Sequence, residues 1–230
     1  MSSDPKRSRA RELAASHLAR GDAVGWFEAL YAEAGGDSAK VPWADLRPNP
    51  NFLDWIAAHR IDGNGRRALV VGCGLGDDAE FLASRGFQVT AFDIAPTAVD
   101  WCGKRFPQST VRYEVGDLLS PAPGWRHAFD FVFEAYTLQV LPAELREQAT
   151  PKLADAVQPG GTLLLICRGR LPQDNEGQMP WPLLRSELSA LERAGLSLEE
   201  FEEFWDRHDD PPVWRFRAGY SRPIVCGTLR

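Results

Sequence analysis

The sequence predicts an α/β fold with a mostly parallel sheet and helices between its strands. One observation is the stretch 67–93, where a strand, a glycine turn, a helix and a second strand follow one another. The other is that strand-like and helix-like segments keep alternating from there to residue 167. Alternation of elements of this length gives parallel strands joined by right-handed crossovers.

The stretch 67–93 also predicts a nucleotide-binding site. An apolar run at 68–71, typical of a buried strand, breaks into Gly-Cys-Gly-Leu-Gly at 72–76, and a helix with acidic residues in its first turn follows. Gly86 ends this helix, and the second strand leads to Asp93. Glycines let a ligand approach the backbone closely, and Asp93 is placed to accept hydrogen bonds from two ribose hydroxyls.

The glycine spacing discriminates among nucleotides. A dinucleotide fingerprint has glycine at positions that correspond here to 72, 74 and 77, but residue 77 is Asp77, whose charge would face a pyrophosphate. No Gly-Lys-Ser/Thr of a P-loop follows the turn. The pattern therefore favours a ligand without phosphates. S-adenosylmethionine, which would leave as S-adenosylhomocysteine, fits this description, and the later Asp117 supports it.

Composition narrows the class of protein. The 230 residues carry a net charge of −6, which argues against nucleic acid or an anionic membrane as partner. The cysteines at 73, 102, 167 and 226 show no C-x-x-C and no histidine pairing, so we expect no metal site and no disulfide framework. The polar N-terminus and the lack of a long apolar run predict a cytoplasmic protein without signal peptide or membrane span.

One domain is expected, with residues 1–60 as an N-terminal helical lid or extension and residues 61–230 as the catalytic α/β core. The pattern predicts helices at 8–20, 22–34, 51–59, 97–105, 143–157 and 183–194. Further strands are expected at 110–115, 129–134, 162–167 and 196–205, with antiparallel edge strands at 213–220 and 224–229.

With these motifs in place, the chain resembles the class I S-adenosylmethionine-dependent methyltransferases over nearly its whole length. The resemblance rests on the glycine turn, Asp93, Asp117-Leu118, Phe129-Asp130 and Gly160-Gly161. It implies a Rossmann-like, mostly parallel seven-stranded sheet with one antiparallel strand, helices on both faces, and ligand bound beyond the carboxyl ends of the strands. The residues that we then expect at the cofactor are Trp26, Trp43, Gly72, Cys73, Gly74, Gly76, Asp93, Ile94, Asp117, Leu118 and Glu134.

In two sequence features the chain resembles one branch of this family, the thiopurine S-methyltransferases and the plant halide/thiol methyltransferases. Val70 stands where most members have a carboxylate, and Pro42-Trp43-Ala44-Asp45 lies upstream after the aromatic helix segment Trp26 to Tyr31. The resemblance implies that Trp43 covers the sulfonium through a cation–π contact, against the alternative of ordinary core packing. The chain departs from the halide/thiol enzymes at Glu134-Ala135-Tyr136, where those have Asp-Tyr.

The segment 134–139 after the fourth strand is the expected acceptor face. We name Glu134, Tyr136 and His208 as candidate catalytic residues, and Tyr31, Tyr136, Gln139 and Trp181 as candidates for the acceptor pocket. Glu134 could equally cap a helix or bind the methionine ammonium group of the cofactor. The segment lacks the Asn/Asp-Pro-Pro-aromatic signature of enzymes that methylate nucleic-acid bases.

The main functional hypothesis is methyl transfer to a small-molecule thiol, by a monomer or homodimer. A thiol with a pKa of about 8.5 supplies thiolate without a strong base. The first alternative is O- or N-methylation of a small molecule, which a strict need for Glu134 or His208 would favour because a hydroxyl needs a base. The second is a protein that binds S-adenosylmethionine without transferring its methyl group.

Overall fold

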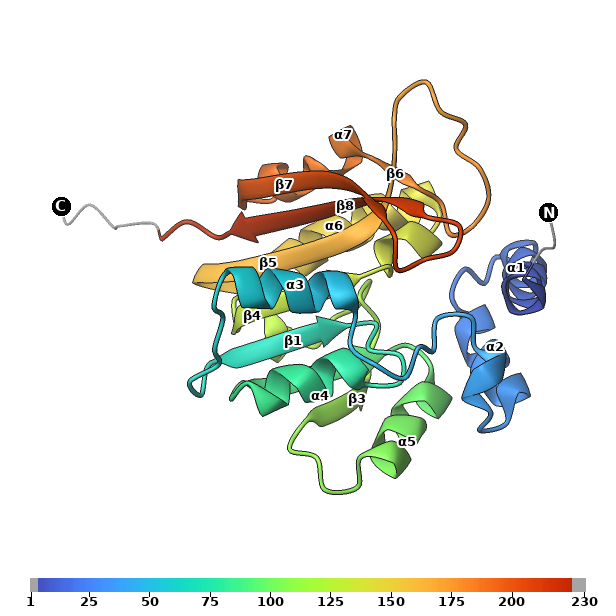
Figure 1. The fold of residues 1–230 in the computed structure, drawn as a ribbon, viewed down its shortest axis with the longest axis horizontal. Helices are drawn as coiled ribbons and strands as arrows, with labels where there is room; N and C mark the ends of the chain where they lie inside the picture. Colours follow the sequence, from blue (N-terminus) through green and yellow to red (C-terminus); the bar gives the residue numbers. More distant parts are fainter. Residues whose placement is uncertain (1–3, 225–230) are drawn as a thin grey trace.

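A computed structural model describes residues 4–224 of the chain. Its sheet runs in the order β3-β2-β1-β4-β5-β8-β7, with the short β6 paired to β5 (Figure 1). The strands are β1 (Arg67–Val71), β2 (Gln88–Asp93), β3 (Arg112–Val115), β4 (Phe129–Ala135), β5 (Val157–Arg170), β6 (Leu183–Leu184), β7 (Ser197–Asp206) and β8 (Val213–Ser221).

The strand directions confirm the expected fold class. β1 pairs in parallel with β2 and β4, and the parallel ladder continues to β3 and β5. β8 is antiparallel to both of its neighbours, β5 and β7. The prediction that 213–220 forms an edge strand is wrong, because β8 lies between β5 and β7 and β7 forms the edge. The strand expected at 224–229 lies outside the described residues except for Ile224, which belongs to no strand.

No helix in the range 4–224 combines the length and the apolar character that crossing a membrane requires.

The helices agree with the sequence pattern except near residue 184. The helical elements are α1 (Pro5–Leu18), α2 (Gly25–Ala34), η1 (Ser38–Lys40), α3 (Pro50–Ala58), α4 (Asp77–Ser84), α5 (Pro96–Arg105), η2 (Pro123–Trp125), η3 (Leu138–Val140), α6 (Ala143–Ala156), α7 (Arg185–Leu188) and α8 (Ala190–Arg193).

The single helix expected at 183–194 is divided into β6, α7 and α8. Leu183 and Leu184 pair with the end of β5, so the chain is still extended there. The Glu187 side chain accepts a hydrogen bond from the Leu184 N–H at 2.7 Å, which starts α7 only after the strand. Ser189 then interrupts the helix by donating its hydroxyl to the Ser186 carbonyl.

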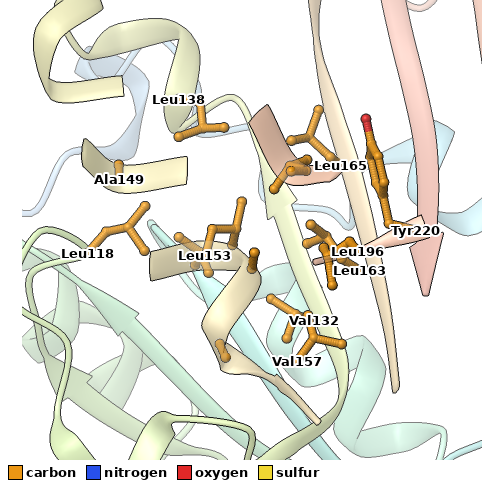
Figure 2. Close-up of a cluster of buried hydrophobic side chains, with 14 of the residues drawn as sticks. Leu118, Val132, Leu138, Ala149, Leu153, Val157, Leu163, Leu165, Leu196 and Tyr220 are labelled. Atoms are coloured by element: carbon orange, nitrogen blue, oxygen red, sulfur yellow. The ribbon is translucent and has the colours of Figure 1, made fainter. Parts of the chain in front are cut away.

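The sheet is buried on both faces because its strands alternate between two cores. Leu69 and Val71 point into a core that includes Leu153 of α6, and Figure 2 shows this cluster around Leu153, Val132 and Leu163. Ala68 and Val70 point to the opposite core, which α3 and α4 cover. Burial on both faces is characteristic of parallel sheets.

The N-terminal helices have two different positions. α1 and α2 lie beyond the end of the sheet toward which β1 points (Figure 1), and α2 packs against α5. α3 packs on a face of the sheet through Phe52, Trp55 and Ile56. Residues of the expected extension therefore serve both the region above the strand ends and the core itself.

Leu153→Ala tests the importance of the core under α6. The side chain is fully buried, so we expect its loss to lower the free energy of unfolding by about 3 kcal/mol, as for other large-to-small core changes. Leu171→Ala, at a position 43% exposed, is the control and should cost about 0.5 kcal/mol or less. Urea unfolding curves measure both values, and equal effects would contradict this account.

Candidate functional site

A cavity of about 310 Å³ opens beyond the carboxyl ends of the parallel strands. Its floor is made by residues that follow β1, β2 and β3 and by the ends of β4 and β5. Side chains of α1, α2 and the loop 42–50 cover it from the other side. The cavity therefore occupies the place where ligands bind in open α/β sheets.

The glycine turn forms part of this cavity. Gly72 and Gly74 have φ values of +61° and +53°, which favour glycine, and both line the cavity together with Cys73. A Cβ on Gly72 would lie 2.3 Å from the hydroxyl oxygen of Thr137. Gly76 does not line the cavity, contrary to expectation. A Cβ there would lie 2.5 Å from the Tyr113 hydroxyl, so this glycine allows close packing below the turn.

Asp93 connects the turns that follow β1 and β2. Its two carboxylate oxygens accept hydrogen bonds from the Gly74 N–H at 2.9 Å and the Ala95 N–H at 3.0 Å. Burial raises the pKa of Asp93 to about 6. Asp93 and Ile94 line the cavity, and so do Asp117 and Leu118 after β3. The sequence prediction had put these four residues around one cofactor, and the structure brings them together.

Asp77 faces away from the cavity. Its carboxylate forms a bidentate ion pair with Arg105 of α5, with both N–O distances at 2.8 Å. The charge that argued against a dinucleotide is therefore used to join α4 to α5. Helix α4 still begins directly after the glycine turn, with acidic residues in its first turn.

Four aromatic side chains form one wall of the cavity: Trp26, Phe27, Tyr31 and Trp43. Trp43, the most exposed of them, donates its indole N–H to the Tyr31 hydroxyl at 2.7 Å. Tyr31 lies at the glycine turn, since a Cβ on Gly74 would be 3.4 Å from its hydroxyl. Tyr31, which the sequence analysis named for the acceptor pocket, thus lies at the glycine-turn end of the cavity. Phe27 was not singled out from the sequence, although it lies on the same aromatic helix.

Glu134 lies below the cavity and does not line it. The side chain is fully buried, and its Oε1 accepts the N–H groups of Thr137 at 2.6 Å and Leu138 at 3.1 Å. Its Oε2 has no partner among the described residues, and burial raises the pKa of Glu134 to about 7. Of the alternatives weighed from the sequence, the geometry matches the cap, and it gives no contact with a substrate in the cavity.

Tyr136 and Gln139 lie at the β4–β5 end of the cavity. Tyr136 has a φ of +69°, a conformation that is rare for a bulky residue and is often found at functional sites. The guanidinium of Arg215 lies 4.4 Å above its ring. Gln139 is buried, and its Oε1 accepts the backbone N–H of Arg168 at 2.7 Å.

His208 lines the same end, from the loop between β7 and β8. Its imidazole is exposed, and its backbone N–H donates to Asp206 at 3.0 Å. Trp181 does not line the cavity, contrary to the prediction for the acceptor pocket. Its ring packs against the cluster that holds Trp26, while its neighbours Met179 and Pro180 line the cavity instead.

Sequence reasoning missed the charged residues at this end. Arg7, Arg168, Asp206, Asp209 and Arg215 all line the cavity. Arg215 is 5% exposed and pairs with Asp206 at 3.0 Å, and it also contacts Asp209. Arg168 could have been noticed, because it directly follows the buried run of β5. Nothing in the sequence pattern indicates that α1 brings Arg7 to the same place.

Glu134→Gln tests the buried carboxyl. Burial raises the pKa of Glu134 from 4.5 to about 7. Between these two pH values the folded protein keeps a proton on this carboxyl that the unfolded chain has released. Wild-type stability should therefore fall as the pH rises through this range. Glutamine does not ionise, so E134Q should not lose this stability. The free energy of unfolding of E134Q relative to that of the wild type should therefore rise by about 2 kcal/mol between about pH 5 and about pH 8.

Urea unfolding without added ligand at both pH values measures this difference. Glu147→Gln, at an exposed position on α6, is the control and should follow the wild type. Parallel pH profiles for the wild type and E134Q would contradict the assignment.

Comparison with known proteins adds to this geometry. Residues 68–161 match the family described as "Methyltransferase domain". The ubiquinone biosynthesis O-methyltransferase of Xanthomonas campestris pv. campestris (strain B100) is 37% identical over 129 residues, which cover 54% of this chain and 52% of that protein. The chain thus spans about half the length of the curated relatives it matches.

Solved structures show the same fold at lower identity. A protein studied for the conversion of a disulfide bond into a thioacetal group during echinomycin biosynthesis has a TM-score of 0.71 at 22% identity, covering 90% of this chain and 94% of that one. The N-methyltransferase NodS from Bradyrhizobium japonicum WM9, in complex with S-adenosylhomocysteine, has a TM-score of 0.66 at 20% identity, covering 85% of this chain and 97% of that one.

The family match agrees with the expected enzyme class, and the solved structures agree with the expected fold. They do not show the finer resemblance to thiopurine and halide/thiol methyltransferases. Residues 68–161 therefore match a methyltransferase domain in sequence, and the chain as a whole shares the fold of solved methyltransferases such as NodS.

Proposed function

We propose that this chain transfers a methyl group from S-adenosylmethionine to an oxygen atom of a small organic acceptor. The observation that carries the proposal is one cavity that joins the glycine turn and Asp93 to a second, charged end containing His208. The curated relative is named an O-methyltransferase, which favours oxygen over the thiol of our first hypothesis. The thiol remains the alternative that the experiments below distinguish.

The residues at the β1–β3 end fit the cofactor. Gly72 and Gly74 line the cavity and carry no side chains of their own, so a ligand can approach the backbone of the turn. Each carboxylate oxygen of Asp93 accepts one backbone N–H and keeps a lone pair for a ribose hydroxyl. Asp117 and Leu118 would hold the adenine. When bound, the cofactor supplies a methyl carbon activated by its sulfonium.

Trp43 would cover the sulfonium from the aromatic wall. Its indole is oriented by the hydrogen bond to Tyr31, and it lines the cavity together with residues of α2 and the glycine turn. A cation near an aromatic face gains about 1–2 kcal/mol when water is excluded. The wall would therefore both attract the cofactor and keep water from the reacting atoms.

At the other end, the chain must orient the acceptor and remove its proton. His208 would accept the proton of an acceptor hydroxyl, since it lines the cavity and its ring has no hydrogen bond within the part of the chain that the structure describes. Tyr136 would position the acceptor next to His208. Its ring is held in place by its backbone conformation and by the contact with Arg215.

Asp93→Asn tests the cofactor end. Replacing an ionised acceptor by an amide weakens hydrogen bonds to two hydroxyls, so we expect the Kd for S-adenosylhomocysteine to rise about 10- to 100-fold. Asp77→Asn is the matched control, because this carboxylate also borders the glycine turn but pairs with Arg105 outside the cavity. Titration calorimetry measures both, and an equal change in the two variants would refute the assignment of Asp93.

His208→Ala tests the acceptor end. For phenolic acceptors we expect kcat to fall about 100-fold with little change in KM, because only proton removal is lost. His127→Ala changes a histidine outside the cavity and should leave kcat unaltered. A screen of phenols, amines, thiols and halide, read as S-adenosylhomocysteine release, supplies the rates. Turnover confined to thiols and unaffected by H208A would refute oxygen transfer, and cofactor binding without any turnover would favour a binding protein.

A further inference from the structure

Arg168 differs from the other arginines around the cavity. Its side chain has no hydrogen bond or ion pair with any residue in the range 4–224, and its Nε is buried without a partner. Arg215 is paired with Asp206 and Asp209, and Arg7 lies 3.4 Å from Asp4 and 3.8 Å from Asp209. Arg47 also lines the cavity without a partner among the described residues, but it is exposed. An unpaired charge in a partly closed cavity is costly, so its retention indicates a partner that comes from outside the chain.

The surroundings of Arg168 add positive charge. Arg7, Arg11 and Arg215 are close enough to lower the pKa of its guanidinium, although burial is the larger cause. The pKa falls only to about 10, so Arg168 remains a cation at neutral pH. The negative charge of Asp209 acts in the opposite direction and raises the pKa of Arg168. Asp209 is already in contact with Arg215, however, and lies 3.8 Å from Arg7.

The position of Arg168 separates it from the cofactor end. The glycine turn follows β1, and β4 lies between β1 and β5, which carries Arg168. Neighbouring strands are about 4.8 Å apart, so the backbone of Arg168 lies about 10 Å from the turn. The backbone N–H of Arg168 donates to Gln139, which holds this part of β5 at the end of the cavity that Tyr136 also lines.

We propose that Arg168 binds a carboxylate of the acceptor, so that the substrate is a small aromatic acid methylated at a hydroxyl oxygen. A carboxylate matches the planar fork of a guanidinium, and its single charge matches that of Arg168, whose Nε is buried without a partner among the described residues. The ring of the acceptor would lie against Tyr136, with its hydroxyl toward His208. This inference rests on the proposed function for the reaction, but the anion site itself does not.

The test compares acids with their neutral amides. Hydroxybenzoates and hydroxybenzamides are assayed for S-adenosylhomocysteine release with the wild type, Arg168→Gln and Arg168→Lys. We expect the wild type to prefer the acids, and R168Q to lower kcat/KM for the acids about 100-fold, mainly through KM, while the amides change less than about threefold. R168K should recover part of the loss, because it restores the charge without the fork.

Binding measurements separate this site from the reaction. Benzoate and benzamide are titrated calorimetrically into each protein saturated with S-adenosylhomocysteine, after circular dichroism has confirmed that the variants are folded. Benzoate that binds the wild type but not R168Q would support the anion site even if no acceptor turns over and the proposed function fails. Benzoate that binds neither, or both equally, would overturn it.

The cofactor's own carboxylate is the competing partner, and one further titration addresses it. If Arg168 serves the acceptor, the Kd for S-adenosylhomocysteine should change less than about twofold in R168Q. A large loss of cofactor affinity, with the preference for acids over amides unchanged, would overturn the proposal and assign Arg168 to the cofactor.

Discussion

The carboxylate of Asp93 is the interaction on which the ligand-binding end of this molecule depends. By accepting N–H groups from Gly74 and Ala95, it joins the turn after β1 to the turn after β2. The turns would otherwise present unpaired backbone donors to a partly buried space, which is costly. The Cys73 N–H donates to the Phe92 carbonyl beside it, so the two turns form one rigid unit. Its rigidity lets the cavity exist before any ligand arrives.

Local sequence patterns were sufficient for this half of the molecule. The apolar run before Gly72, the glycines themselves and a carboxylate after the next strand are all close in sequence, and each has its own physical meaning. The resemblance implied a seven-stranded sheet with a single antiparallel strand, whereas the order of the strands was not predicted. The bounds of α3, α4 and α5 agree with the pattern to within a residue or two, because proline, asparagine and acidic residues mark their starts.

The other half could be predicted only in part. Tyr136, Gln139 and His208 were named from the sequence and line the cavity. Arg7 and Arg168 come from α1 and β5, and only the folded chain brings them to the same place. Glu134 was misjudged because a carboxylate at a strand end has the same sequence signal whether it faces a ligand or caps a turn. Trp181 and Tyr31 were misplaced because an aromatic residue gives no local sign of which way its ring points.

The antiparallel course of β8 has a consequence for how this protein and its relatives diverge. It brings the segment 206–215 back to the carboxyl edge of the sheet, where α1 also arrives, and both lie outside the matched segment 68–161. The charged residues that join Tyr136 and Gln139 at the acceptor end are therefore encoded outside the stretch that carries the glycine turn and Asp93. Mutation can remodel the outer stretches while the glycine turn and Asp93 stay fixed, so paralogues could acquire new acceptors while keeping one methyl donor.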